Sequence, residues 1–255
     1  MDRASFHAAL KSESEALRTA APGNLAVPVP TCPGWAIGDL VRHLGEVYEF
    51  FTDVVSTGAI DSSALHEKHQ TMRAERDEAF AQSDRLLDWY RDRTDALLAA
   101  LRSRSVDARV WTWWEPVQSV GWYDRRMAHE TAVHRWDVEH ALGDAVPIDP
   151  ELSVDGIDEA LSMHAVDRRP DSELPGRNEL FRFRTTDIPG QWDVFFPEAG
   201  GVEVTSTDEQ KAGVAVAGPA SDILLYLWQR SPADSLSVVG NRQFLDRWFD
   251  LIPPD

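Results

Sequence analysis

The hydrophobic periodicity of the chain changes near residue 147, and this change constrains the fold more than any other feature. Before it, apolar residues recur with the helical period of about 3.6 over residues 3–20, 36–56, 72–103 and 120–142. After it, four short segments alternate with the period of a strand: LFRFRTT, QWDVFFP, GVEVTST and AGVAVAG. Pro147 and Pro150 interrupt any helix between the two halves. The pattern predicts an α+β protein, with a four-helix bundle followed by a small domain that contains an antiparallel sheet.

The remaining segments complete this prediction. We expect a loop over residues 56–69 and a domain boundary near residues 145–151. In the second half we expect helices over about residues 151–166, in ASDILLYLWQRS and in RQFLDRWFDLI.

Charge and cysteine usage exclude several classes of protein. The formal net charge of −18 argues against binding to nucleic acid or to an anionic membrane surface, because both need clustered basic charge. A single cysteine, Cys32, excludes an internal disulfide and a metal site built from several cysteines. No signal-peptide core and no apolar run of membrane-spanning length is visible. We therefore expect a cytoplasmic monomer or homodimer.

The segment MAHETAVHRWDVEH, residues 127–140, carries the chemistry of the first half. On a helix, Glu130 and His134 lie about 40° apart and share a stripe with apolar residues. Left unpaired there, each would cost about 2 kcal/mol or more. His129 and His134 are about 140° apart and cannot share a metal on a regular helix. Glu130 and His134 are therefore the candidate ligand pair, and a third ligand must come from another element.

His43 is the candidate for that third ligand. It lies at the edge of the apolar face of the predicted helix over residues 36–56. Two histidines and one carboxylate are the ligands of catalytic zinc sites with an open position, and also of non-haem iron sites. The alternative is a histidine at the core edge that makes one ordinary hydrogen bond.

Two motifs extend this argument to a family. VPTCPGWAIGDLVRHLGEV followed by RRMAHETAVHRWDVEHALG resembles the mycothiol-dependent maleylpyruvate isomerase family. The resemblance implies a DinB-like four-helix bundle over residues 1–146 and a sterol-carrier-protein-like α+β domain over residues 151–255. It also implies a divalent metal, usually zinc, with His43, Glu130 and His134 as ligands. Ala36 departs from the family pattern, in which a threonine follows PGW, and this weakens a helix cap.

The resemblance implies an isomerase or S-transferase that acts on a small electrophilic substrate with mycothiol as its thiol. A thiol at the open metal position would ionise at neutral pH. Cys32 is expected to be a small buried residue and not the nucleophile. Two alternatives stay open: a non-catalytic protein that senses or sequesters a ligand, and a hydrolase that uses zinc-bound water.

Several other residues are candidates for the same site. Asp137 is either a partner that holds His134 from behind or a fourth metal ligand. Arg126, Trp113 and Trp114 are expected to line a substrate or thiol pocket, the alternatives being a solvated arginine and aromatic packing between domains. Arg230 is expected to bind a substrate carboxylate, the alternative being a charge that interacts with a helix C-terminus. Four further histidines are expected on an exposed loop (His66, His69) and on the surface or between helices (His129, His140).

Overall fold

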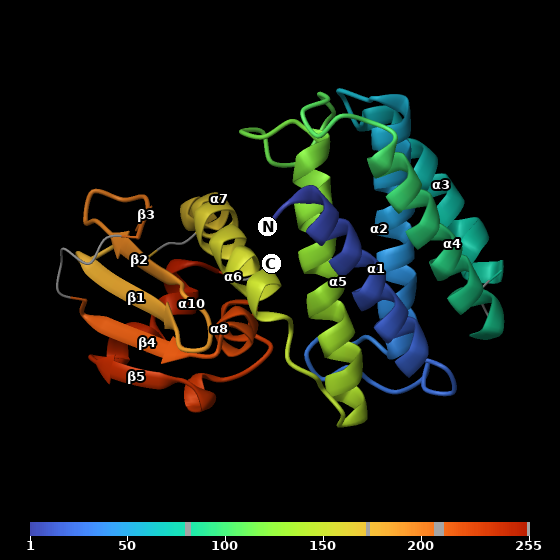
Figure 1. Cartoon of the computed structure of the whole chain (residues 1–255). Coiled ribbons are helices and arrows are strands. Elements are labelled where there is room, and N and C mark those ends of the chain that lie inside the picture. Colours follow the sequence, from blue (N-terminus) through green and yellow to red (C-terminus); the bar gives the residue numbers. More distant parts are fainter. Residues whose placement is uncertain (80–82, 172–173, 207–211, 254–255) are drawn as a thin grey trace. The chain divides into compact units, whose positions relative to one another are not determined.

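The computed structural model describes residues 1–79, 83–171, 174–206 and 212–253. The chain divides into two compact units, Met1–Val146 and Pro147–Asp255 (Figure 1). Among the described residues, no helix is both long enough and apolar enough to cross a membrane.

The first unit is a four-helix bundle with one additional helix. The helices are α1 (Arg3–Ala20), α2 (Ile37–Thr57), α3 (Ser63–Ala79), α4 (Ser83–Arg102) and α5 (Val120–Leu142). In the bundle, α1 packs against α5 and α2 packs against α4, while α3 contacts α2 (Figure 1). At Gly45 the α2 backbone comes so close to α4 that a Cβ atom would lie 2.1 Å from the ring of Trp89.

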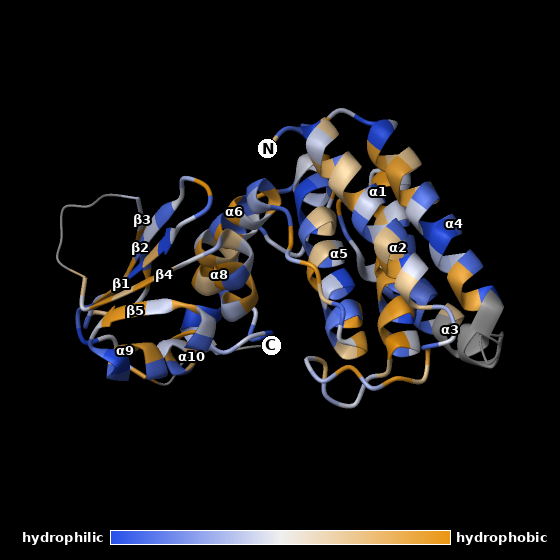
Figure 2. Ribbon diagram, turned by 60° about the horizontal axis from the view of Figure 1, so that its bottom comes forward, coloured by the Kyte–Doolittle hydropathy of each residue, from blue (hydrophilic) through white to orange (hydrophobic). Residues whose placement is uncertain are grey.

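The bundle core follows from the apolar stripes of its helices. Figure 2 shows hydrophobic and hydrophilic stretches interleaved along them, as amphipathic helices require. The buried apolar positions of α2 recur at helical spacing and are Ile37, Leu40, Val41, Leu44, Tyr48, Phe51, Val54 and Val55. Helix α5 differs, because it also buries polar side chains: Asp124, Arg126, His129, Thr131, His134, Arg135 and Asp137. Buried polar groups need partners, so α5 is the helix on which to look for a site.

The loop predicted over residues 56–69 is wrong in its second half, where α3 begins at Ser63. The apolar pattern over residues 72–103 is divided between α3 and α4, and residues 80–82 lie outside the described part. The first half of helix α3 was not predicted, because none of its residues from Ser63 to Met72 is buried and the sequence there shows no apolar face. Its contacts with α2 include polar ones, since Lys68 Nζ and His69 Nε2 lie 2.7 and 2.9 Å from Asp53 Oδ2. The rings of His66 and His69 also meet that of Phe50 on α2, at 4.7 and 5.2 Å.

The second unit is a sheet covered by helices. It begins with α6 (Pro150–Glu159), which continues through a π-helical turn (Ala160–His164) into α7 (Ala165–Arg168). The strands are β1 (Glu179–Thr185), β2 (Gln191–Phe196), β3 (Glu203–Thr205), β4 (Val214–Gly218) and β5 (Ser237–Gly240). The other helices are α8 (Ala220–Leu227), α9 (Arg242–Asp246) and α10 (Trp248–Leu251), with short 3₁₀ turns at Arg169–Asp171 and Ala233–Ser235. These elements confirm the α+β fold class.

The sheet itself is mixed, with the order β3-β2-β1-β4-β5. The expectation of antiparallel strands is wrong for one pair, because β1 and β4 are parallel, with Phe181 opposite Val214. Alternation along a strand shows which face is buried but not the direction of its neighbour, so the sequence could not distinguish the two arrangements. Strand β5 was not predicted, and none of its residues is buried.

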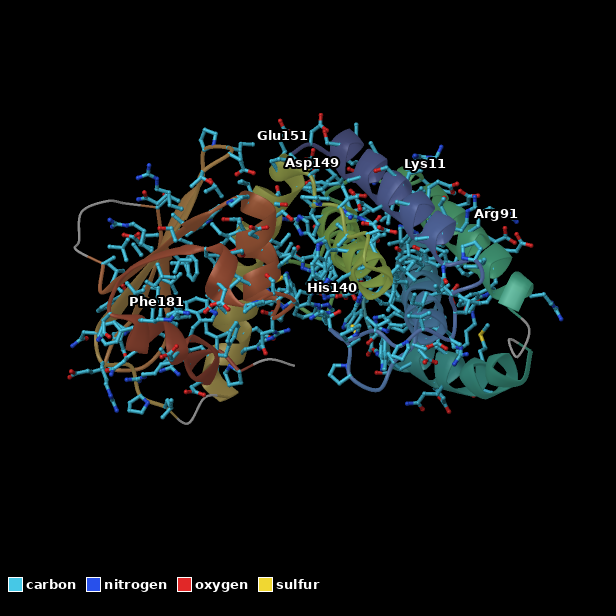
Figure 3. The ribbon with its side chains drawn as sticks, turned by 90° about the horizontal axis from the view of Figure 1, so that it is seen from below. Lys11, Arg91, His140, Asp149, Glu151 and Phe181 are labelled. Carbon is cyan, nitrogen blue, oxygen red and sulfur yellow. The ribbon has the colours of Figure 1, made fainter. Side chains whose placement is uncertain are left out.

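Aromatic packing forms the core of this unit. The ring of Trp248 on α10 lies 5.1 Å from Phe181 and 4.9 Å from Phe183, both on β1. Phe181 is fully buried, whereas Lys11 of α1 and Arg91 of α4 lie on the outer surface of the first unit (Figure 3).

Candidate metal centre

Helix α5 presents Glu130 and His134 side by side, one turn apart. The Oε1 atom of Glu130 lies 3.3 Å from Nε2 of His134. Helix α2 brings His43 to the same carboxylate, with its Nε2 atom 3.4 Å from Glu130 Oε1. The ligand atoms that these three residues offer all lie within 4.8 Å of one another. The structure thus brings the three predicted ligands together from two helices.

A buried hydrogen bond holds these two helices together beside the cluster. The hydroxyl groups of Tyr48 on α2 and Thr131 on α5 lie 2.5 Å apart, and both side chains are fully buried. Thr131 follows Glu130 directly, and Tyr48 lies five residues after His43. The bond therefore fixes the register of α2 against α5 where the cluster requires it.

The spacing of the cluster fits a divalent metal. Ligand atoms about 2.0–2.1 Å from a tetrahedral zinc ion lie about 3.3 Å from each other. The two nitrogen–oxygen separations in the cluster, 3.3 and 3.4 Å, agree with this value. The side chains of His43 and Glu130 are 34% and 21% exposed, so one side of the cluster is open to solvent.

Asp137 lies behind His134, on the opposite edge of the imidazole ring. Its Oδ2 atom accepts a hydrogen bond from His134 Nδ1 at 2.9 Å. Its Oδ1 atom accepts from the hydroxyl of Thr31 at 2.5 Å, and Cys32 Sγ lies 3.6 Å from Oδ2. A carboxylate in this place fixes the ring and directs Nε2 toward Glu130, which favours the first of the two roles expected for Asp137.

Cys32, His134 and Asp137 form a second cluster of potential ligands, which overlaps the first through His134. Asp137 is fully buried, and its hydrogen bonds from Thr31 and His134 already occupy both oxygens. The first cluster combines the ligand types of catalytic zinc sites with access from solvent, so we regard it as the candidate centre.

Arg126 completes the charge balance of the site. One turn before Glu130 on α5, its Nη2 atom donates to Glu130 Oε2, which leaves Oε1 to face the two histidines. Burial raises the pKa of Glu130, but the Arg126 charge and hydrogen bonds from His134 and His43 outweigh it and hold this pKa well below the usual value. Burial lowers the pKa of His134, but hydrogen bonds with Asp137, Cys32 and Glu130 raise it well above the usual value.

Two residues of the site were not found from the sequence alone. Thr31 contacts Asp137, and the ring of Trp35 lies 5.0 Å from that of His43. Both belong to the motif VPTCPGW, which marked the family but suggested no contact with the ligands. The partnership of Arg126 with Glu130 had a visible signal, the i, i+4 spacing of opposite charges on one helix.

The predicted tryptophans lie near the start of α5. Trp113 is exposed, and its ring meets that of Trp122 edge to face at 5.1 Å. The backbone carbonyl of Trp114 accepts a hydrogen bond from Thr112 Oγ1. Trp122 precedes Glu130 by two turns, or about 12 Å along the helix. A pocket role for Trp113 and Trp114 stays a prediction.

Arg230 belongs to the second unit, just beyond the end of α8. Its Nη1 atom donates to the backbone carbonyl of Trp228 at 2.8 Å, and its own amide donates to Leu225. Its expected contact with a substrate carboxylate also stays a prediction.

The remaining candidates have ordinary environments. His129 is buried between helices against Phe6, and His140 is exposed and stacks on Trp136. His66 and His69 lie on α3 and not on a loop. Cys32 is partly exposed, which corrects the expectation of a buried residue. Ala36 caps α2 without a side-chain hydrogen bond, as expected.

The fold and the cluster together define a class: a helical bundle with a candidate metal centre, joined to a small mixed-sheet domain. Residues 6–139 match the mycothiol maleylpyruvate isomerase N-terminal domain, and residues 151–247 match the C-terminal domain of the same family. The chain therefore belongs to the mycothiol maleylpyruvate isomerase family, as the two sequence motifs indicated.

Solved structures agree with this assignment. A crystal structure of the mycothiol-dependent maleylpyruvate isomerase covers 93% of this chain and 93% of its own, with a TM-score of 0.64 and 13% sequence identity. A mutant of that isomerase, with a histidine replaced by alanine, covers the same shares with a TM-score of 0.63 and 13% identity. Similarity at this identity shows the fold alone. No curated protein matches the sequence of this chain.

Proposed function

We propose that this protein is a metal-dependent enzyme in which a low-molecular-weight thiol acts on a small electrophilic substrate. The observation that carries the proposal is the cluster on α2 and α5, in which Glu130 Oε1 faces Nε2 of His43 and of His134 at the spacing of metal ligands. Its open side supports catalysis over a structural role, because structural zinc sites are closed by four protein ligands.

The residues in and around the cluster have different roles. His43, Glu130 and His134 would hold the metal, Arg126 fixes the second oxygen of Glu130, and Asp137 fixes the ring of His134. A bound divalent metal would supply a Lewis acid that favours the ionised form of a thiol at neutral pH. Addition of the thiol to a double bond, rotation and elimination would isomerise the substrate and regenerate the thiol. Displacement of a leaving group would be S-transfer.

The thiol must come from outside the chain. Cys32, the single cysteine, has its sulfur atom against Asp137, on the far side of the His134 ring from Glu130. The family includes an isomerase that depends on mycothiol, so we propose mycothiol as the thiol. The two histidines and one carboxylate of the cluster support zinc as the metal.

Metal content tests the first half of the proposal. Purified protein should contain about one divalent ion per chain, and His43→Ala, Glu130→Ala and His134→Ala should each lose it. His140→Ala is the matched control, because it removes an exposed histidine from the same helix and should keep the metal. If all three ligand variants retain the metal of the wild type, the centre is wrongly placed.

Turnover tests the second half. Small electrophiles, including anionic compounds with a cis double bond, should be converted only when a low-molecular-weight thiol is added. Mycothiol should support faster turnover than glutathione. Equal turnover without thiol would contradict the proposal and favour hydrolysis by zinc-bound water. Binding of metal without turnover of any compound would favour a sensor or sequestering protein.

We also propose that Arg230 binds a carboxylate of the substrate. Arg230→Ala should then raise KM or lower kcat without changing metal content, which would separate recognition of the substrate from metal binding. Unchanged kinetics in this variant would leave Arg230 as a helix-terminal charge.

A further inference from the structure

The loop formed by residues 29–36, which we call the Thr31 loop, has a fixed shape. The amide of Val29 donates to Trp35 O at 2.8 Å, and the amides of Cys32 and Trp35 donate to Val29 O and Cys32 O at 3.1 and 3.0 Å. Pro28 and Ala36 pair as an antiparallel bridge across its base. The loop thus closes on itself immediately before α2, which carries His43.

One arm of the loop reaches His134 through Asp137. A carboxylate can only accept, so the hydroxyl of Thr31 donates to Asp137 Oδ1 and the ring of His134 donates from Nδ1 to Oδ2. With Nδ1 carrying this hydrogen, the nitrogen that remains for a metal is Nε2, which faces Glu130. Because both oxygens of the buried carboxylate are held, it cannot turn away from the ring.

The other arm reaches His43 directly. The ring of Trp35 lies 5.0 Å from the ring of His43, at an interplanar angle of 56°. The ring of His43 also meets that of His134 edge to face at 5.5 Å. One loop therefore contacts both histidines of the candidate centre, one through an aromatic ring and one through a carboxylate.

We propose that the Thr31 loop is the positioning element of the metal centre, in which Thr31 acts on His134 through Asp137 and Trp35 acts on His43. This inference rests on the proposed function for the metal itself. It assigns a role to the TCPGW motif: the loop sets the direction of two ligand nitrogens without contributing a ligand. Thr31 and Trp35 are positioning residues, since neither touches the reacting atoms.

The test compares zinc affinity, measured by competition with a chromogenic chelator, in conservative pairs of variants. Thr31→Val keeps the shape of the side chain but removes the donor, and it should weaken zinc binding by roughly 10- to 100-fold. Thr31→Ser keeps the donor and should bind nearly as tightly as the wild type. Trp35→Leu should weaken zinc binding, whereas Trp35→Phe keeps an aromatic ring and should retain most of the wild-type affinity. Thr57→Val removes a comparable hydroxyl from the exposed end of α2 and should have no effect.

A role in stability alone would give a different result. In that case Thr31→Val would lower the melting temperature but leave the zinc affinity of the folded protein unchanged. Unchanged affinity in both Thr31→Val and Trp35→Leu overturns the inference while leaving the metal centre in place.

A second measurement does not depend on metal. In the metal-free protein, the Nδ1 proton of His134 should give a nitrogen-15-coupled NMR signal that is protected from exchange with water, assigned by its loss in His134→Ala. Thr31→Val should shift this signal and speed its exchange, and Thr31→Ser should restore it. If the wild type binds no zinc, the proposed function fails. A signal that is the same in the wild type and in Thr31→Val overturns the inference on its own.

Discussion

In the proposed centre, His134 is the residue at which metal binding and protonation would compete. Hydrogen bonds with Asp137, Cys32 and Glu130 outweigh burial and raise its pKa in the metal-free protein. The charged ring then stabilises the metal-free fold fully below the ordinary histidine pKa of about 6.5, and this stabilisation is lost as the pH rises through the raised pKa. A metal needs the neutral ring, so binding must displace the proton from Nε2.

The first prediction follows from this competition. Zinc binding should weaken as the pH falls below the raised pKa of His134, and at neutral pH about one proton should be released for each ion bound. Glu130 should release none, because its pKa is already well below the usual value. Calorimetric titration in two buffers of different ionisation enthalpy measures the number of protons. An affinity that is independent of pH, with no proton release, would show that His134 is not a ligand.

Arg126 gives the second prediction. Its side chain is 6% exposed and pairs with Glu130, so its removal leaves a largely buried carboxylate without its strongest cation. Arg126→Met should destabilise the metal-free protein by about 3 kcal/mol in urea unfolding, the lower end of the range for breaking a buried ion pair. Arg91→Met, in an exposed pair, is the control and should change stability by less than about 0.5 kcal/mol. Equal effects of the two substitutions would show that the Arg126 pair contributes no more than a surface pair.

At the residue scale, the sequence predicts which side chains share a face of one helix. The angle between Glu130 and His134, and the exclusion of His129 as their partner, follow from about 100° per residue. Contacts between distant segments do not follow from it. Thr31 and Asp137 are 106 residues apart, and no local pattern indicates that they meet. The position of His43 at a core edge and the ligand chemistry of Glu130 and His134 made His43 the candidate third ligand, and the resemblance to a family supported this choice.

At the scale of elements, polar contacts with Asp53 help to attach the polar helix α3 to α2. Burial raises the pKa of Asp53, but hydrogen bonds from Lys68 and His69 lower it by more than burial raises it. The pKa of Asp53 therefore lies below its ordinary value. The contribution of Asp53 to stability is therefore present above the unfolded carboxyl pKa of about 3.9 and is lost as the pH falls through the lowered pKa. Ion pairs at such an exposed surface contribute about 0.2–1 kcal/mol each.

The third prediction concerns this attachment. Asp53→Asn at neutral pH should release part of α3 from α2, and hydrogen exchange of the amides of Ser63–Met72 should become severalfold faster. Asp88→Asn removes a carboxylate from an exposed pair within α4 and should leave exchange in α3 unchanged. Equal exchange in the wild type and in Asp53→Asn would mean that other contacts hold α3.

Apolar periodicity in the sequence indicates an element when one of its faces is buried. Helix α2 and strand β1 show this periodicity, because burial selects the residues of that face. Helix α3 has no buried residue between Ser63 and Met72, and β5 has none at all, so neither showed such a face. The direction of β4 beside β1 depends on how the chain crosses the sheet, which the residues of neither strand record.

At the scale of the whole molecule, we propose that the two compact units are the domains expected over residues 1–146 and 151–255. The connection between α5 and α6 is tied to the first unit by Arg135, whose Nη1 atom donates to Val146 O at 2.5 Å. Residues 143 and 144 and residues 146 and 147 are exposed, as sites of proteolysis require.

The fourth prediction is that limited proteolysis cuts between residues 143 and 150 before it cuts within either unit. Mass spectrometry of the first fragments would locate the cut. Zinc should stay with the fragment that ends near residue 146, because all three candidate ligands belong to the first unit. An early cut within α2 or α5 would contradict the proposed division.

The most direct test of the metal centre is anomalous diffraction at the zinc absorption edge from crystals of the protein grown with zinc. The predicted result is an anomalous peak for one zinc ion, about 2.0–2.2 Å from Nε2 of His43, Nε2 of His134 and Oε1 of Glu130. One coordination position of this ion should be filled by no protein atom. A peak between Cys32 and Asp137, or no peak near α5, would contradict the proposed centre.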